Sequence, residues 1–596
     1  MKSFPTKIVS LGGRVLLVAV IAILLFILLQ STQEFTYFYR EQNQLFIWDM
    51  PHLTKMLLPI GGCCKALSQM LVQFFVLPKM GALITTLVCL TGAHFLWCAL
   101  KNLCNSWGLI PACFLPFFIY NIYLMDHFVK YEGLLALCFL AVFFWIFTLL
   151  KNLQVYIKLA GACVLVLLLF YLAGSIAMLL AGCMLVFELI RQPKKGMLFA
   201  LPGVLVLVAG ALAVGRAWLI DYPFAYGMQH YTEYYFEPTG FYTLAWAVTI
   251  ALIPIFWLFG KLNLQKIWVQ AALGIALVAV LPFMYNTMGN SHQDRDMYSL
   301  ERIVHYANTE QWDEIIAQGH TTTNNYISLN YLNLALSKKG QLLEKLFQYA
   351  QNSSQAVFLD YQQFTDIGVL RARQYYQMGV IGAAQMNAVS AKMSMAEGCP
   401  SMQQLIIKDY IITGRYNIAE KYINELEKSW YYADWAKSMR QYLYNDKAVE
   451  ADPELGMKRR DLPKDNESFA IYAGIYNDTQ TVMSANPEDT AAADYAIACM
   501  LLDKNFNYIV PFTKYNFENG YWKELPLRLQ EAILTAQEQN MDFAREFGIS
   551  EEMIERFAQF RKDALNLRHS GGSVNQLAAR WGDTFWYYML KNNKSK

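Results

Sequence analysis

Residues 14–31 read RVLLVAVIAILLFILLQS, an apolar run that follows an arginine and ends in glutamine and serine. A helix needs roughly 20 mostly apolar residues to cross the hydrocarbon core of a bilayer. Eight further runs of this kind lie near residues 81–100, 107–125, 133–150, 155–173, 175–190, 197–219, 241–260 and 267–286. The first half of the chain therefore predicts nine membrane-spanning helices.

Basic residues in the short breaks between these runs predict the orientation. If the N-terminus is cytoplasmic, the breaks on the cytoplasmic side contain Lys101, Lys151, Arg191, Lys194, Lys195, Lys261 and Lys266. An excess of Lys and Arg in short loops marks the cytoplasmic side. We expect a cytoplasmic N-terminus and a C-terminal domain on the opposite side of the membrane.

The segment Met56–Leu77 is apolar, but it carries Lys65 near its middle. If it were a span, Lys101 and Lys151 would lie on the outer side, against the charge rule. A charge near the centre of a bilayer is also costly. We therefore predict an interfacial or re-entrant helix on the outer face.

The near-neutral net charge of +2 conceals two halves of opposite sign. Before residue 290 there are 17 Lys and Arg against 9 Asp and Glu, and after it 32 against 38. Neither half has a basic stripe with interleaved aromatic residues, so we expect no nucleic-acid partner. Nine of the 11 cysteines lie in the first half, and the other two, Cys399 and Cys499, could pair if that region is extracytoplasmic.

The second half predicts pairs of helices separated by turn glycines. Gly340, Gly379 and Gly414 are 39 and 35 residues apart, a period typical of helix-pair repeats. The string RYNIAEKY after Gly414 resembles a tetratricopeptide-type repeat. The stretch Asp446–Glu467, with two prolines and mixed charges, predicts a loop that interrupts the array.

These patterns give an all-α fold class with two domains. Residues 1–290 predict a polytopic helical membrane domain of about nine spans plus an interfacial helix, and residues 291–596 an extracytoplasmic, tetratricopeptide-like α-solenoid. Such a solenoid usually presents a concave surface to a peptide or protein.

Acidic, amide and aromatic side chains are dense in the first predicted outer loop, where residues 34–49 read EFTYFYREQNQLFIWD. This mixture suits a sugar, because carboxylates accept hydroxyl protons while aromatic rings cover the apolar face. Basic side chains on the outer side, against the charge rule, suit anions. The candidate catalytic residues are Glu41, Asp49 and Asp126, and the candidate substrate-binding residues are Arg40, Lys79, His127 and Arg216.

The chain has no P-loop, no H-E-x-x-H, no G-x-S-x-G and no dinucleotide-binding glycine pattern. We expect no cofactor and no metal. A divalent metal held by Asp49, His52, Asp126 and His127 is compatible with the residue types, but their spacing is scattered.

The topology resembles that of the GT-C-type membrane glycosyltransferases, which take a sugar from a polyprenyl-phosphate carrier. In that superfamily an acidic residue in the first outer loop is the catalytic base. The resemblance implies Glu41 or Asp49 as the base, and Arg40 or Arg216 as the residue that neutralises the phosphate leaving group. The acidic pair common directly after the first span is absent, since Gln33-Glu34 stands there.

Two stretches, YREQNQLF at residues 39–46 and QFFVLPKMG at residues 73–81, resemble an uncharacterised family of Bacteroidetes polytopic membrane proteins with tetratricopeptide-like C-terminal regions. That resemblance implies no activity. Together with the charge pattern, it implies a protein of the bacterial inner (cytoplasmic) membrane whose N-terminus is cytoplasmic and whose C-terminal domain is periplasmic.

Three functions therefore stay open, and whether the protein is an enzyme is one of the questions. The first is an outer-face glycosyltransferase that uses a polyprenyl-phosphate-linked sugar. The second is a membrane-anchored scaffold whose helical repeats recruit envelope assembly proteins or peptides. The third is a lipid or solute carrier. In each case the lipid bilayer is an expected partner.

Overall fold

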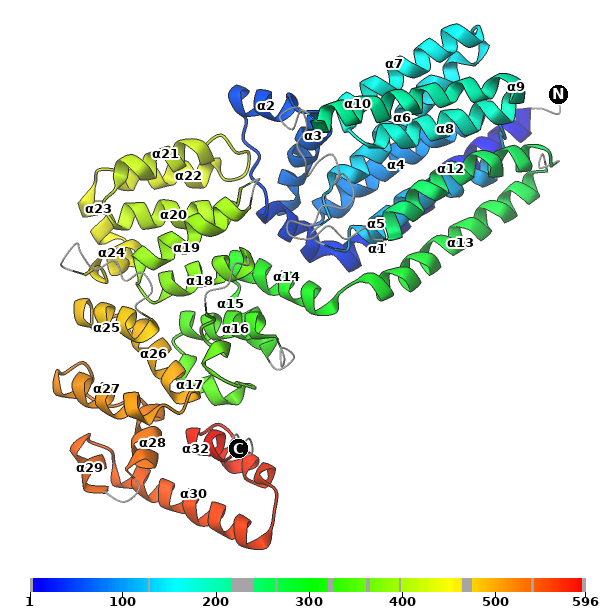
Figure 1. The fold of residues 1–596 in the computed structure, drawn as a ribbon. Helices are drawn as coiled ribbons and strands as arrows, with labels where there is room; N and C mark the ends of the chain where they lie inside the picture. The colour runs from blue at the N-terminus through cyan, green and yellow to red at the C-terminus, as the bar shows by residue number, and fades with distance from the viewer. Residues whose placement is uncertain are drawn as a thin grey trace. The chain divides into compact units, whose positions relative to one another are not determined.

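The computed structural model describes residues 4–126, 129–215, 240–262, 266–319, 325–360, 365–395, 398–463, 474–537 and 541–591. These residues form helices and contain no strand, which confirms the all-α class. The chain divides into two compact units (Figure 1). The first unit contains Met1–Glu301 and Lys428–Tyr431, and the second contains Arg302–Glu427 and Tyr432–Lys596.

Within the described residues, seven helices of the first unit are long and apolar enough to cross a membrane. They are α1 (Phe4–Gln42), α4 (Met80–Leu100), α6 (Glu132–Leu149), α7 (Val155–Ala173), α10 (Leu201–Gly215) with the turns before it, α12 (Gly240–Gly260) and α13 (Ile267–His292). The protein is therefore a membrane protein with several apolar helices.

The other two predicted spans form shorter helices. Residues 107–125 form η2 (Trp107–Phe114) and α5 (Leu115–Tyr123), and residues 175–190 form α8 (Ile176–Arg191). Pro111 lies inside η2 and Pro116 in the first turn of α5. Each proline removes a backbone donor, which favours a short 3-10 segment over one long α-helix. The total number of spans stays a prediction.

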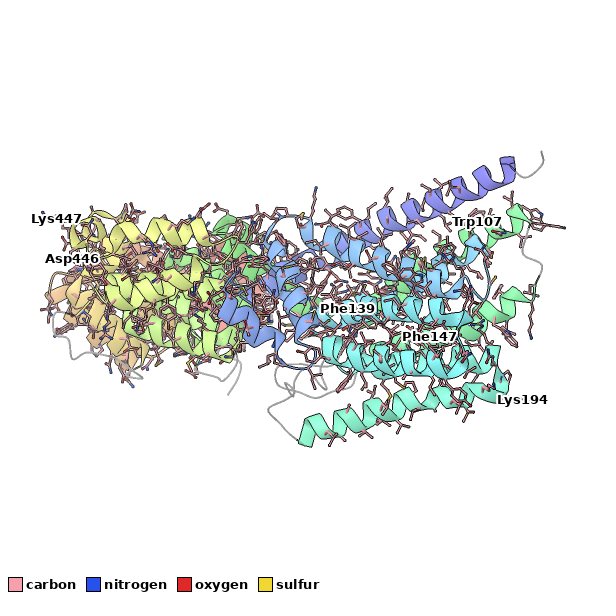
Figure 2. The ribbon with its side chains drawn as sticks, turned by 90° about the horizontal axis from the view of Figure 1, so that it is seen from above. Trp107, Phe139, Phe147, Lys194, Asp446 and Lys447 are labelled. Carbon is pink, nitrogen blue, oxygen red and sulfur yellow. The ribbon has the colours of Figure 1, made fainter. Side chains whose placement is uncertain are left out.

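The basic breaks of the first unit meet at one end of its helices. The Nζ of Lys151 donates to Oδ1 of Asn102 at 2.8 Å. The ring of Trp97 lies near both Arg14 and Lys101, with charge-to-centroid distances of 5.4 and 5.2 Å. Figure 2 shows Lys194 toward the same end. The charge pattern predicts that these basic residues lie at one end of the helices. The assignment of this end to the cytoplasmic side stays a prediction.

The segment Met56–Leu77, predicted as an interfacial or re-entrant helix, is divided into shorter helices, and its place on the outer face of a membrane stays a prediction. Helix α2 (Met50–Leu57) ends before a turn, and α3 (Gly62–Val72) follows it. Gly61 in this turn has a φ of 83°, and a Cβ on Gly62 would lie 2.0 Å from the carbonyl oxygen of Met56. The turn can close this tightly only around glycine. Helix α2 buries no residue, whereas α3 packs against α6 and α7.

The second unit is a succession of helices that pack on their neighbours in chain order (Figure 1). It begins in α14 (Arg295–Asn308) and continues through α15 (Trp312–Ala317), α16 (Tyr326–Lys338), α17 (Leu342–Lys345), α18 (Thr365–Gln377), α19 (Ile381–Ser394), α20 (Pro400–Ile412), α21 (Tyr416–Leu426) and α22 (Ala433–Met439). The predicted turn glycines end α16, α18 and α20.

These glycines have the left-handed conformation that ends a helix. Gly340, Gly379 and Gly414 have φ values of 66°, 77° and 70°. After Gly414, the N–H of Arg415 donates to the carbonyl of Tyr410 at 2.9 Å, the bond expected of this helix ending. The helix–glycine–helix pairs are confirmed, and their tetratricopeptide-like character stays a prediction.

The predicted loop Asp446–Glu467 is wrong over its first part, which forms α23 (Asp446–Ala451) and α24 (Pro453–Arg460). The side chain of Asp452 accepts from the backbone N–H groups of Glu454 and Leu455 and so caps α24. Pro453 stands at the first helical position, where a missing N–H costs little. Residues 464–473 lie outside the described residues.

The remaining helices are α25 (Ile475–Ala485), α26 (Ala491–Leu502), α27 (Phe506–Glu518), α28 (Leu527–Ala536), α29 (Met541–Glu546), α30 (Glu551–Ser570), α31 (Ala578–Trp581) and α32 (Phe585–Lys591). Helix α32 returns to earlier parts of the unit. The ring centroid of Phe347 lies 5.9 Å from that of Phe585 and 5.1 Å from that of Tyr588.

Cys399 and Cys499 are buried free thiols.

Helices α7 and α8 are joined by a buried ion pair between Lys158 and Glu188, whose side chains are 4% and 3% exposed. The ammonium lies 4.8 Å from the ring centroid of Phe147, which Figure 2 marks among the helices. The rings of Phe187 and Phe199 also face it, at 5.9 and 5.8 Å. The charge of Lys158 is therefore balanced by one carboxylate and three aromatic faces.

Replacing one partner of this pair leaves the other charge buried without compensation. We expect Glu188→Ala to lower the free energy of unfolding by about 3–5 kcal/mol, and the double variant Lys158→Met/Glu188→Leu to lower it less. Unfolding of the full chain by SDS in mixed detergent micelles measures both. Lys151→Gln, which changes an exposed lysine, is the control. A double variant less stable than Glu188→Ala would contradict this account.

Candidate functional site

Arg40, in the last turn of α1, binds backbone carbonyls. Its Nη1 donates to the carbonyl of Val129, and its Nη2 donates to those of Leu124 and Asp126 at 2.7 and 2.8 Å. These carbonyls lie just beyond α5, where a helix leaves acceptors unpaired. Arg40 thus holds the segment that carries Asp126 against the end of α1.

The other predicted residues of this region lie on neighbouring elements. Glu41 is 3% exposed, and its Oε2 accepts from Nε2 of Gln42 at 2.7 Å. Asp49 precedes α2, and its carboxylate accepts from Lys428 of the same unit at 3.0 Å. Lys79 is exposed directly before α4, with a φ of 67°. His127 and Arg216 lie outside the described residues.

Buried polar side chains join the C-terminal part of α1 to three other helices. Nε2 of Gln33 donates to the carbonyl of Asn121 on α5 at 2.7 Å and to the hydroxyl of Tyr285 on α13 at 2.9 Å. The hydroxyl of Thr36 donates to Glu301 on α14 at 2.6 Å. These hydrogen bonds connect α1 to α5, α13 and α14 a few residues before Arg40 and Glu41.

The described residues contain no group of three or more His, Cys, Asp and Glu side chains that could hold a metal ion. Of the set compatible with a divalent metal, Asp49, His52 and Asp126 are described and His127 is not.

A pocket of about 390 Å³ lies within the second unit, among α14, α15, α16, α18, α20, α22 and α24. We call it the Lys338 pocket. Its lining combines aromatic rings with charged and amide groups and consists of Ala307, Asn308, Thr309, Glu310, Trp312, Leu334, Lys338, Arg373, Tyr376, Ser401, Met402, Gln404, Leu405, Lys408, Trp435 and Glu454.

One wall of this pocket is held by Glu454. Both of its carboxylate oxygens lie 2.9 Å from Nζ of Lys408, and Oε1 accepts from the hydroxyl of Tyr376 at 2.7 Å. Burial raises the pKa of Glu454, but Lys408 and Tyr376 outweigh it and hold that pKa below its usual value. Glu454 is therefore an ionised carboxylate that is already paired.

Lys338 stands at the end of α16 between two rings. Its Nζ lies 5.9 Å from the ring centroids of Trp312 and of Tyr376. Desolvation in the pocket and the charges of Lys458 and Lys408 together lower the pKa of Lys338 to about 8, although Glu454 and Glu310 act to raise it. The ammonium is charged at neutral pH without a closely paired anion.

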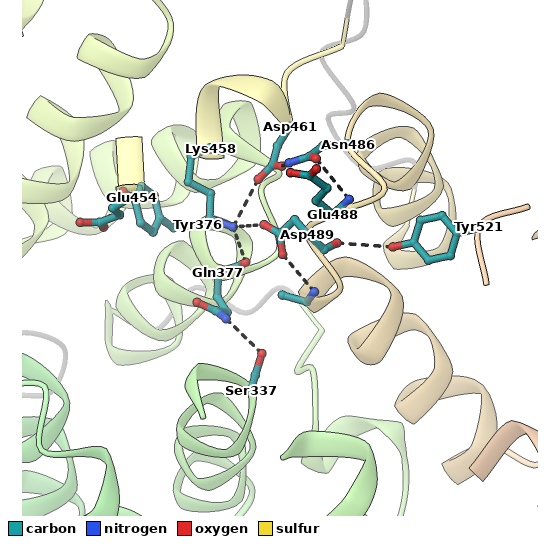
Figure 3. Close-up of polar contacts among 11 residues, drawn as sticks. Ser337, Tyr376, Gln377, Glu454, Lys458, Asp461, Asn486, Glu488, Asp489 and Tyr521 are labelled. Atoms are coloured by element: carbon teal, nitrogen blue, oxygen red, sulfur yellow. Dashed lines mark hydrogen bonds and ion pairs between the residues drawn. The ribbon is translucent and has the colours of Figure 1, made fainter. Parts of the chain in front are cut away.

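Behind the pocket, Lys458 connects three segments of the second unit (Figure 3). Its Nζ donates to the carboxylate of Asp489 and, at 2.8 Å, to the carbonyl of Gln377, and it lies 3.3 Å from Asp461. Asn486 donates to Asp461 at 2.6 Å. Lys458 therefore contacts both buried carboxyl groups, Asp461 and Asp489. Since Lys458 lies on α24, these contacts hold in place the helix that carries Glu454.

A second concavity, about 580 Å³, lies beside α19 and α20. We call it the α19 groove. Its apolar lining follows one face of α19 at Met386, Val389 and Met393, and continues to Tyr410 on α20. Met393 is 79% exposed.

Sequence reasoning missed both concavities. Lys338 precedes Gly340, and a lysine in the last turn of a helix ordinarily complements the helix dipole. Glu454 and Lys458 fall in the stretch that was predicted as a loop. The pair Asp452-Pro453, a capping residue followed by proline, is typical of a helix start and could have indicated α24.

A family model, described as "Family of unknown function (DUF6057)", matches residues 9–592. The chain belongs to this family. The DUF6057 match includes both units, so the helical second unit is part of what defines the family, and the predicted membership of an uncharacterised family is confirmed. No curated protein and no solved structure matches the chain.

Several buried carboxyl groups of the second unit predict how its stability depends on pH. Burial, together with the charge of Asp489, raises the pKa of Asp461 from 3.8 to about 7. Burial also raises the pKa of Asp494 to about 7. Between about pH 4 and 7 the folded chain holds more protons than the unfolded chain, so stability falls as pH rises through this window.

We expect the Tm of the full chain in detergent to fall from pH 5 to pH 8. Asp461→Asn should reduce this fall, because an amide mimics the protonated carboxyl at every pH. Thermal unfolding at a series of pH values measures the effect, with Asp434→Asn, on an exposed aspartate, as the control. If the Asp461→Asn and control curves have the same pH slope, Asp461 is not the group responsible.

Proposed function

We propose that this membrane protein is a docking protein of the bacterial envelope. Its apolar helices anchor it in the bilayer, and its second unit recruits an envelope assembly protein through the α19 groove. The observation that supports this function is the exposed apolar face of α19. Met393 is 79% exposed, and Met386 and Val389 line the same groove.

The partner segment best suited to this groove is an amphipathic helix. Positions 386, 389 and 393 are three and four residues apart, so they lie on one helix face. Methionine side chains are flexible and adapt to the apolar surface of a partner. Grooves of this kind take helices whose apolar residues follow the same spacing.

The proposal includes a periplasmic second unit in an inner-membrane protein. The basic breaks share one end of the first unit, which supports a cytoplasmic assignment of that end. Helix α13 begins beside Lys266 and leads away from that end toward α14 and the second unit.

A photo-crosslinking amino acid at position 393 tests the docking function in the full-length membrane protein. We expect it to capture one envelope protein through a segment with apolar residues at helical spacing, identified by mass spectrometry of the crosslinked peptides. Met386→Asp/Met393→Asp should reduce co-purification of that protein about tenfold or more. The same crosslinker at exposed Asp434 is the control, and capture of equal yield there would overturn the proposal.

The first outer region supports a second candidate, a GT-C-like transferase that uses a polyprenyl-phosphate-linked sugar. Glu41 is buried beside Arg40, which holds the Asp126 segment. In this role Glu41 or Asp49 deprotonates the acceptor hydroxyl. Exposed Lys79 suits the phosphate better than Arg40, whose donors bind three carbonyls. No observation among the described residues favours the lipid or solute carrier.

Glu41→Gln tests the transferase, because the amide keeps the shape of the side chain but cannot accept a proton. We expect transfer of labelled sugar from a polyprenyl-phosphate donor in membrane vesicles to fall at least about a hundredfold. Glu34→Gln, in the same region, is the control, and an unchanged Tm shows that the variant is folded. Full activity in Glu41→Gln/Asp49→Asn would exclude both residues as the base.

A further inference from the structure

The Lys338 pocket presents hydrogen-bond donors that the fold itself does not use. The ammonium of Lys338 and the indole N–H groups of Trp312 and Trp435 have no hydrogen-bond acceptor among the described residues, and all three residues line the pocket. A pocket with unpaired donors selects a ligand rich in acceptor oxygens.

Cations outnumber carboxylates in the lining of the same pocket, where Lys338, Arg373 and Lys408 stand against Glu310 and Glu454. Glu454 already accepts from Lys408 and from Tyr376. The guanidinium of Arg373 donates to Oδ1 of Asn308 and, at 3.3 Å, to the carbonyl of Ala307, and it keeps its positive charge. The excess of positive charge favours an anionic ligand over a cationic one.

The surroundings of Lys338 indicate that its ammonium has room for an anionic partner. Its ammonium lies 5.9 Å from the ring centroids of Trp312 and Tyr376 and makes no ion pair among the described residues. A carboxylate or phosphate bound here would pair with it through a charge-assisted hydrogen bond.

Size and wall chemistry restrict the rest of the ligand. The volume of about 390 Å³ lies at the small-molecule end of the range for ligand sites. Trp312, Trp435 and Tyr376 supply flat apolar surfaces beside polar groups such as Gln404. A sugar ring has an apolar C–H face and a rim of oxygens, so it matches both parts of this lining.

The walls are held in place from behind. Nε2 of Gln377 donates to the hydroxyl of Ser337 at 3.3 Å, which joins α18 to the end of α16 beside Lys338. Lys458 joins α24 to the carbonyl of Gln377 (Figure 3). The pocket is therefore built by side chains that hold α16, α18 and α24 together in the fold.

We propose that the Lys338 pocket binds an anionic monosaccharide unit, a hexose ring that carries a carboxylate or a phosphate. Lys338 pairs with the anionic group, and the indole rings pack against the sugar ring. This site is separate from the α19 groove, so it stands whether or not the docking function does.

Calorimetric titration of the purified full chain in detergent with glucuronate, glucose 6-phosphate and neutral glucose tests this proposal. We expect at least one of the two anions to bind in the low millimolar range or tighter, and glucose about tenfold more weakly. Which anion binds better distinguishes a sugar acid from a sugar phosphate.

Lys338→Gln should weaken binding of the anionic sugar about tenfold and leave the response to glucose unchanged. Lys338→Arg should retain binding. The matched control is Lys339→Gln, one residue further along, where the lysine pairs with exposed Asp313 at 2.7 Å. An unchanged Tm shows that each variant is folded.

Three results would overturn the proposal. The first is no binding by either anionic sugar, and the second is equal affinity of wild type and Lys338→Gln. The third is tighter binding of inorganic phosphate or of a triglutamate peptide, which would assign the pocket to a bare anion or to an acidic protein segment.

Discussion

A helix in an apolar medium must pair its own backbone groups, and this requirement governs the first unit. Its described residues are mainly helical, and where α5 ends, a side chain provides donors for the carbonyls that follow. Arg40 donates to the carbonyls of Leu124, Asp126 and Val129. Arg40 is one of the basic residues that the sequence predicts on the outer side, against the charge rule. Its hydrogen bonds to backbone carbonyls explain why an arginine stands there. Buried charged side chains also need partners, and Lys158 and Glu188 provide this for each other.

Three lysines of the fold differ in what balances their charge, and the comparison shows where a ligand is expected. Lys158 and Lys458 each meet carboxylates of the fold. Lys338 meets aromatic rings and other cations, and its pocket is open to a small molecule. A lysine that is paired with a carboxylate of the fold contributes to stability or favours one packing of the helices over others. A charge left without a close partner is available for recognition.

The fold was predictable wherever one local pattern decided it. Apolar length identified seven of the long helices, and the glycines at 340, 379 and 414 identified the helix pairs. The prediction was wrong in the Asp446–Arg460 stretch, where the prolines and mixed charges suggested a loop although Asp452 and Pro453 begin a helix. The Lys338 pocket could not be predicted, because its residues run from Ala307 to Glu454 and become neighbours only through the packing of helices.

Helix α32 closes the second unit from the far end of the chain. Phe585 and Tyr588 pack on Phe347, about 240 residues earlier, and the N–H of Phe585 donates to Glu531 at 2.8 Å. During synthesis, the surface around Phe347 is exposed long before its cover exists. This surface therefore stays partly uncovered until α32 is synthesised, and a chain truncated before Phe585 carries every helix of the middle region but leaves this apolar surface exposed.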